Sequence, residues 1–259
     1  MQNLTLATAP NRYSPRYYRM TARAVGVVFL AGMVLYLVGN LALVEPILAA
    51  PDHLATVSAN SLPFAIGAIL MLMPAAGDAA HGILMLPVLK QHNERVAFGY
   101  FGARIIDAVF LAGGIALLLL QIPLGREYLN AGGPNASFLQ TLSTLSIDAH
   151  LYAYQIAMIA VGLAGLMLCY MFYTARLIPR LLAVWGLIGY AVLLSGSVLE
   201  VLGFHPGLIH TIPGGLFELF IGVWLIAKGF SSASPILAQP TASSMTPTVE
   251  SAPLASVTS

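Results

Sequence analysis

Long apolar stretches alternate with short polar connections along most of the chain. Six of these stretches are nearly free of charge, and they run from 24 to 44, 62 to 89, 96 to 123, 151 to 175, 181 to 199 and 211 to 227. Each is close to the ~20 residues that a helix needs to cross ~30 Å of hydrocarbon. The pattern predicts an all-α fold, a polytopic membrane bundle of six transmembrane helices.

The composition excludes a soluble protein. The chain is 58% hydrophobic and 8% charged, with a mean hydropathy of +0.84, whereas soluble domains are ~25% charged. A net charge of +1 gives no support for a nucleic-acid partner, so membrane lipids are the expected surroundings. The single cysteine, Cys169, lies in the fourth stretch, and an intrachain disulfide is therefore excluded.

The basic residues predict how the bundle is oriented. Arg126 falls on one side of the predicted ladder, and the other basic residues are assigned to the opposite side: Arg12, Arg16, Arg19, Arg23, Lys90, Arg95, Arg104, Arg176, Arg180 and Lys228. Cytoplasmic loops of membrane proteins carry an excess of Lys and Arg. The sequence therefore predicts a multi-pass protein of the cell inner (plasma) membrane with both termini in the cytoplasm.

The chain divides into three predicted regions. Residues 1–23 form a cytoplasmic juxtamembrane segment rich in Tyr and Arg, and residues 24–228 form the six-helix domain. Residues 229–259 are rich in Ser, Pro, Thr and Ala, which cannot bury a core, and are expected to be a disordered cytoplasmic tail. The connections 45–61 and 124–148 are the longest, and Gly132-Gly133-Pro134-Asn135 predicts a turn in the second.

Small residues predict that the helices pack closely against one another. Glycine allows two backbones to approach within a membrane, and it occurs in pairs: Gly99 and Gly102, Gly113 and Gly114, Gly162 and Gly165, Gly186 and Gly189, and Gly214 and Gly215. Six helices are few for a transporter acting alone, which favours a homo-oligomer formed through these faces. Tyr100, Trp185 and Trp224 are expected to be anchors at the membrane interface.

Ionisable residues inside the apolar stretches give the candidate binding site: Asp78, His81, Arg104, Asp107 and Glu218. A charged side chain at that depth costs at least ~2.5 to 3.5 kcal/mol unless it is paired. Asp78 and His81 are spaced i,i+3, as are Arg104 and Asp107, so each pair shares one helical face. A rise of ~1.5 Å per residue puts all five groups at overlapping depths. We therefore expect them to meet inside the bundle.

This set of residues contains more acid than base. Arg104 can pair with one carboxylate, either Asp107 or Glu218. At least one carboxyl group is then expected to hold a proton or to await a cation. The alternative for Arg104 and Asp107 is an ion pair that only fixes the rotation of the helix.

A second polar layer is predicted near the outer face. Asp148, Tyr152 and Gln155 are spaced i,i+4,i+7 with His150 on the adjacent face. Further members follow at the end of the fifth stretch and the start of the sixth: Glu200, His205 and His210. His210, Gly214 and Glu218 form an i,i+4,i+8 line that would connect this layer to the buried site.

The outer histidines predict neither a metal site nor a cofactor. Their side chains and the nearby carboxylates are suitable ligand types, but the sequence lacks the His-x-x-x-His and His-Glu-x-x-His spacings that hold zinc on a helix. An interfacial position is the simpler interpretation of these residues.

Four segments together resemble a family of bacterial membrane proteins, the domain-of-unknown-function family 4386. They are Pro87–Lys90, Gly99 through Asp107, Ile178 through Gly189, and Pro213 through Phe230, and the resemblance spans roughly residues 20 to 230. It implies a bacterial inner-membrane protein, but no activity. It also implies that Arg104, Asp107 and Glu218 belong to the family pattern, while His205 and His210 do not.

Three functions are compatible with these patterns. The first is a small-solute or proton-coupled transporter in which the buried acids titrate. The second is a membrane-embedded enzyme acting on a lipid or isoprenoid, with Asp78 and His81 as acid and base. The third is a non-catalytic accessory protein whose buried charges are purely structural. The small-molecule ligand is not identified by any motif.

Overall fold

The computed structural model describes residues 13–131, 134–231 and 234. These residues contain no strand, and six helical runs in them are long and apolar enough to cross a membrane. The predicted all-α, six-helix membrane bundle is therefore confirmed. The predictions for residues 1–12 and for most of the tail, residues 235–259, lie outside the described residues.

The first run, Pro15–Leu48, consists of α1 (Pro15–Leu37), a π-helix (Val38–Val44) and α2 (Glu45–Leu48). It begins at Pro15 because the side chain of Ser14 accepts the Tyr17 N–H at 3.3 Å and proline suits the first helical turn. Inside the π-helix, Gly39 lies against Gly67 of α4 (Ser61–Lys90), where an added Cβ would be 2.6 Å from the Gly67 carbonyl oxygen. Glycine therefore allows the first two spans to pack backbone to backbone.

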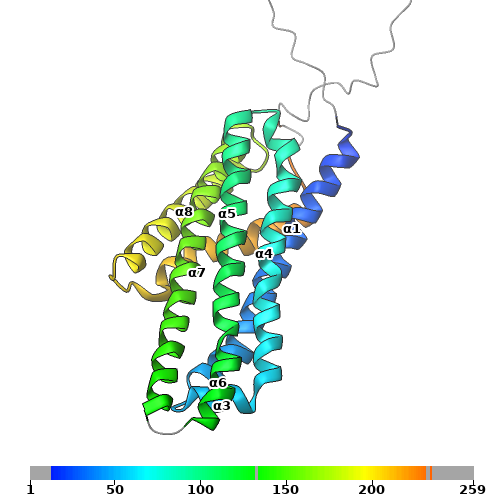
Figure 1. The fold of residues 1–259 in the computed structure, drawn as a ribbon. Helices are drawn as coiled ribbons and strands as arrows, with labels where there is room; N and C mark the ends of the chain where they lie inside the picture. Colours follow the sequence, from blue (N-terminus) through cyan, green and yellow to red (C-terminus); the bar gives the residue numbers. More distant parts are fainter. Residues whose placement is uncertain (1–12, 132–133, 232–233, 235–259) are drawn as a thin grey trace, which may run out of the picture.

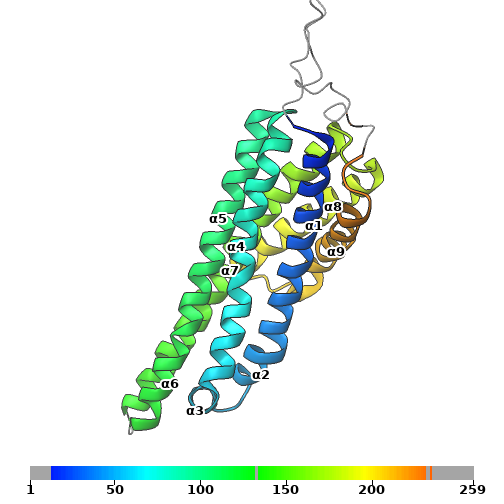
Figure 2. The same ribbon diagram turned by 90° about the vertical axis from the view of Figure 1, so that its right-hand side faces the viewer.

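The third and fourth spans are longer than a bilayer is thick. α5 (Glu94–Leu119) continues almost directly into α6 (Gln121–Asn130), and α7 (Pro134–Thr174) has 41 residues, or about 60 Å of helix. Both views show the end that carries α3 and α6 reaching well beyond α8 (Arg180–Val201) and α9 (Ile212–Ala227) (Figures 1 and 2). The bundle is therefore asymmetric along its axis.

The two long connections predicted at 45–61 and 124–148 are largely helical. Within 45–61 the chain forms α2 and α3 (His53–Ala59), and within 124–148 it continues α6 and begins α7 at Pro134. Buried polar groups join these helices: Ser143 Oγ donates to Gln121 Oε1 at 2.6 Å, Gln121 Nε2 donates to the Ser143 carbonyl at 3.0 Å, and His53 Nε2 lies 2.7 Å from Ser143 Oγ. Of the turn predicted at Gly132-Gly133-Pro134-Asn135, the two glycines lie outside the described residues, and Pro134 and Asn135 begin α7.

Basic side chains mark the opposite end of the bundle, where α1 begins, α4 meets α5, α7 meets α8, and α9 ends (Figure 2). The described members are Arg16, Arg19, Arg23, Lys90, Arg95, Arg176, Arg180 and Lys228. Arg104 was wrongly included in this group. It lies ten residues inside α5 and is 2% exposed, so it does not contribute to the charge of the basic end.

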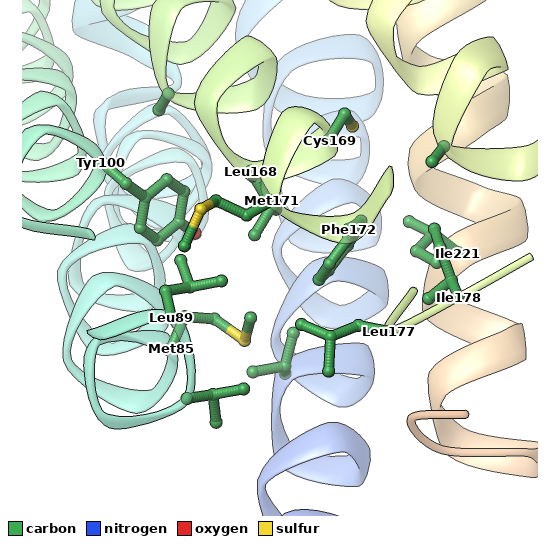
Figure 3. Packing of buried hydrophobic residues seen from close by; sticks show 14 of the residues in the cluster. Met85, Leu89, Tyr100, Leu168, Cys169, Met171, Phe172, Leu177, Ile178 and Ile221 are labelled. Atoms are coloured by element: carbon green, nitrogen blue, oxygen red, sulfur yellow. The ribbon is translucent and has the colours of Figure 1, made fainter. Parts of the chain in front are cut away.

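The main apolar core fills the half of the bundle nearest the basic end. Figure 3 shows Met85 and Leu89 of α4 with Tyr100 of α5 facing Leu168 and Phe172 of α7, and other members of the same cluster come from α1, α8 and α9. This core joins all six spans and supports the site described below.

Only some of the paired glycines lie at contacts between helices, as predicted. A Cβ on Gly165 would lie 2.2 Å from Tyr190 Cγ, and one on Gly162 would lie 2.8 Å from Leu194 Cβ. Gly102, Gly113 and Gly215, in contrast, have nothing within 4 Å of an added Cβ. For these three the prediction of a helix contact within the chain was wrong.

We expect Gly165→Ala to lower the thermal stability of the detergent-solubilised protein, because Tyr190 is fully buried and overpacking costs about 1 to 3 kcal/mol. Gly113→Ala is the matched control, since it gains similar helix propensity, up to ~1 kcal/mol, without a clash. The fraction that stays monodisperse after heating measures the difference. Equal tolerance of both substitutions would contradict the packing described here.

Candidate functional site

A partly open cavity of about 210 Å³ lies between the helices, and residues from all six spans contribute to its wall. Most of the wall is apolar. The aromatic and polar members are Phe29, Tyr36, Asp78, His81, Arg104, Tyr154, Thr211 and Glu218. Four of the five residues predicted for the buried site therefore line one cavity, and the fifth, Asp107, contacts one of them.

The cavity lies near the middle of the spans. Asp78 is twelve residues from Lys90, Arg104 is ten residues from Glu94, and Glu218 is ten residues from Lys228, which places them about 15 to 18 Å along their helices from the basic end. That distance is about half of the ~30 Å hydrocarbon thickness. The polar wall of the cavity is thus at membrane depth.

α1 and α9 touch at one point and line the cavity beyond it. A Cβ on Gly26 would lie 2.5 Å from the Gly222 carbonyl oxygen, so the two helices touch there. The residues that α1 and α9 give to the cavity, within 28–37 and 211–218, all lie further from the basic end than this contact. The cavity therefore occupies the space between α1 and α9 beyond their crossing point.

Arg104 connects α4 and α5 at the centre of the site. Its Nη1 lies 2.9 Å from Asp78 Oδ1 and 3.3 Å from Asp107 Oδ2, with Arg104 and Asp107 almost completely buried. Asp78 keeps 24% of its side chain exposed. One carboxylate is thus sealed against the guanidinium, while the other is both paired with it and accessible.

Tyr100 extends this network to His81. The Tyr100 hydroxyl accepts a hydrogen bond from Arg104 Nε at 3.4 Å and contacts His81 Nδ1. A guanidinium can only donate, so the hydroxyl proton is available for His81 Nδ1. In the neutral imidazole the remaining proton then lies on Nε2.

Glu218 enters the cavity from α9 with a different partner. The hydroxyl of Tyr190 donates to Glu218 Oε1 at 2.9 Å, and Tyr190 is itself fully buried. Glu218 forms no ion pair with a described residue. It is therefore a carboxyl group held by a neutral donor in the wall of the cavity.

Three atoms of this network are buried without a hydrogen-bond partner: His81 Nε2, Arg104 Nη2 and Asp107 Oδ1. Buried polar groups usually have partners, and each one that lacks a partner costs about 1 to 3 kcal/mol or more when charged. Two of the three side chains line the cavity. Such unmet bonding capacity beside a cavity is typical of a site that receives a ligand or water.

The predicted outer polar layer does not assemble into one site. Asp148 and Tyr152 are exposed on α7, whereas His150 is buried with Nδ1 2.9 Å from the Gly114 carbonyl oxygen. Gln155 is only partly buried, but its Oε1 is sealed without a partner. Among the described residues, these four form no hydrogen bond or ion pair with Glu200 or with the two histidines of the α8–α9 connection.

The α8–α9 connection forms its own local arrangement. Glu200 Oε2 lies 3.1 Å from His205 Nδ1, and Glu200 Oε1 accepts the Gly207 N–H at 3.1 Å. His210 Nδ1 lies 2.6 Å from the Gly207 carbonyl, and the His210 ring packs directly on Gly196. Glu200 and the histidines therefore shape a turn.

The structure does not place His210 in the wall of the cavity to which the predicted path would lead. His210 belongs to a 3-10 segment (Gly207–Thr211) before α9 begins, and it does not line the cavity. Thr211, Gly214 and Glu218 are the residues of this region that do. In the described part of the chain, no group of three or more His, Cys, Asp or Glu side chains could hold a metal ion.

Aromatic residues are the part of the site that the sequence did not predict. Tyr100 was expected at the membrane interface but is fully buried between His81 and Arg104. Tyr36 and Tyr154, whose rings stack at 5.8 Å, both line the cavity. The only signal available was spacing, since Tyr100 lies one helical turn before Arg104.

We expect Arg104→Leu to destabilise the protein by about 3 to 5 kcal/mol, because Asp107 would be left as a buried charge without its partner. Replacing both residues, as Arg104→Leu with Asp107→Leu, should recover part of that loss, because Asp78 also loses its partner but keeps 24% of its side chain exposed. The unfolding free energy in detergent micelles measures both variants. If the double variant were as unstable as the single one, the paired charges would not explain the burial of Arg104.

The family model described as "Domain of unknown function (DUF4386)" matches residues 24–229, and the chain belongs to this family. The match includes every residue of the cavity wall. No curated protein and no solved structure matches the chain. The site geometry is therefore the basis for a functional proposal.

Proposed function

We propose that this member of the DUF4386 family is a proton-coupled transporter of a small solute. The observation that carries the proposal is the mid-depth cavity, which all six spans line and which has Asp78 and Glu218 in its wall. Ionisable residues inside transmembrane segments commonly mark ion or substrate pathways. Arg104 neutralises the negative charge of the site only in part, since its single charge is shared by two of the three nearby carboxylates.

Glu218 is the group best suited to exchange a proton. It is partly exposed, it faces the cavity, and its one hydrogen-bond donor is the neutral Tyr190 hydroxyl. A carboxyl group without an ion-pair partner is more easily protonated in a poorly hydrated site than one fixed to a guanidinium. Asp107, sealed against Arg104, serves to hold the guanidinium in place.

We expect Glu218→Gln to abolish pH-driven proton uptake in proteoliposomes, because glutamine keeps the shape but cannot accept the proton. Asp148→Asn, which removes an exposed carboxylate outside the cavity, should leave uptake unchanged. A pH-sensitive dye trapped inside the liposomes reports the flux. If the folded Glu218→Gln variant takes up protons at the wild-type rate, Glu218 has no role in proton transfer.

The alternative of a lipid-modifying enzyme has weaker geometric support. It needs Asp78 and His81 to act together as acid and base, but Asp78 bonds to Arg104 and His81 contacts Tyr100. Lipid profiles of a deletion strain and of an Asp78→Asn strain test this alternative directly. A lipid that accumulates or disappears in both strains would favour the enzyme over the transporter.

The proposed orientation places the basic end of the bundle in the cytoplasm, in a bacterial inner membrane. Eight described basic residues lie at that end, and Arg126 lies on α6 toward the other. The positive-inside rule then puts both ends of the six-span domain on the cytoplasmic side. The end that carries α3 and α6 would project on the outer side.

We expect Glu127→Cys to react with a membrane-impermeant maleimide in intact cells, and Arg95→Cys to react only after the membrane is permeabilised. Both positions are at the surface of the bundle, at opposite ends. The native Cys169 is fully buried and gives little background. The reverse labelling pattern would show that the bundle faces the other way.

A further inference from the structure

The chemistry of the cavity wall indicates which solute it accepts. We infer that the cavity binds a small lipophilic organic cation, a protonated or quaternary amine with an apolar body. This inference rests on the proposed transport function and specifies the class of its substrate. It follows from the charge balance, the aromatic wall and the size of the cavity.

The charge balance favours a cation. Among the described residues of this site, three carboxyl groups face one guanidinium, and Arg104 Nη1 already bonds to Asp78 and Asp107. The accessible polar surface belongs to the acids, because Asp78 and Glu218 are partly exposed whereas Arg104 is 2% exposed. A bound anion would meet these carboxylates first. A bound cation would instead offset part of the excess negative charge.

The aromatic wall favours an organic cation. Phe29, Tyr36 and Tyr154 line the cavity together with the two accessible acids. An ammonium group is attracted to the face of an aromatic ring, and quaternary ammonium ligands are commonly held in this way. The guanidinium of Arg104 lies 5.8 Å from the Phe29 ring centroid, so this ring already faces one positive charge of the site.

The apolar part of the cavity wall suits an organic ligand better than a hydrated metal ion. No group of three candidate metal ligands occurs in the described part of the chain, and most of the wall consists of apolar side chains such as Met33, Met158 and Leu193. A cavity of ~150 Å³ holds a benzene molecule. About 210 Å³ therefore has room for a ligand of roughly ten non-hydrogen atoms.

The position of the cavity gives such a ligand an apolar route of access. It lies between α1 and α9 beyond the contact of Gly26 with Gly222, and Leu37 of α1, which lines it, is 46% exposed. An amine with an apolar body partitions into a membrane with its charge near the headgroups. It could then reach the carboxylates of the wall from the lipid side.

The test uses tritiated benzyltrimethylammonium, a permanent cation, and the full-length protein in lipid nanodiscs. We expect saturable binding that unlabelled benzyltrimethylammonium displaces and that phenylacetate, an anion of similar size, does not. Glu218→Gln should weaken binding at least tenfold, and Tyr36→Leu should weaken it several-fold by removing one aromatic face. Asp148→Asn is the matched control and should bind like the wild type.

The outcomes separate this inference from the proposed function. Displacement by phenylacetate, or no binding of the cation to the folded wild-type protein, overturns the inference even if proton uptake still depends on Glu218. Binding that depends on Glu218, in a protein that moves no protons, supports the cation site and removes proton coupling. If Glu218→Gln does not fold, the competition on the wild type and the Tyr36→Leu variant still decide.

Discussion

The ion pair between Arg104 of α5 and Asp78 of α4 fixes the arrangement of the bundle. Leaving such a charge unpaired at membrane depth costs at least ~2.5 to 3.5 kcal/mol, so the two helices must turn these side chains toward each other. The opposite faces then turn outward, and Ile83 and Ile106 are more than half exposed there. One polar contact therefore sets the rotation of both helices and decides which residues can meet at the centre.

The cavity follows from this constraint together with the close helix contacts. Gly26 and Gly222 bring α1 against α9, and Gly165 brings Tyr190 close to α7, so that Tyr190 reaches Glu218. Beyond these contacts the spans separate, and the acids line the space between them. The apolar core (Figure 3) lies between the polar network around Arg104 and the basic end of the bundle, and it supports that network.

The sequence predicted the six spans and four cavity residues because a charge in an apolar stretch is a strong signal: burial is costly, so such a residue must face the interior. Aromatic residues carry no such signal. Tyr100 fits an interface as well as a core, and only its contact with His81 decides between them. The helices within 124–148 were not predicted because they carry no long apolar stretch and are held partly by polar pairs such as Gln121 with Ser143.

The central claim is that Glu218 faces a cavity that water and small cations can reach, although it lies at membrane depth. In a Cys169→Ala background, the rates at which Glu218→Cys and Leu219→Cys react with the cationic thiol reagent 2-(trimethylammonium)ethyl methanethiosulfonate test this directly. The two positions share a depth, but their side chains are turned about 100° apart on α9, and Leu219 is 41% exposed at the surface. Only an ionised thiol reacts, so the account predicts rapid modification at 218 and almost none at 219. Two equally inert cysteines would contradict it.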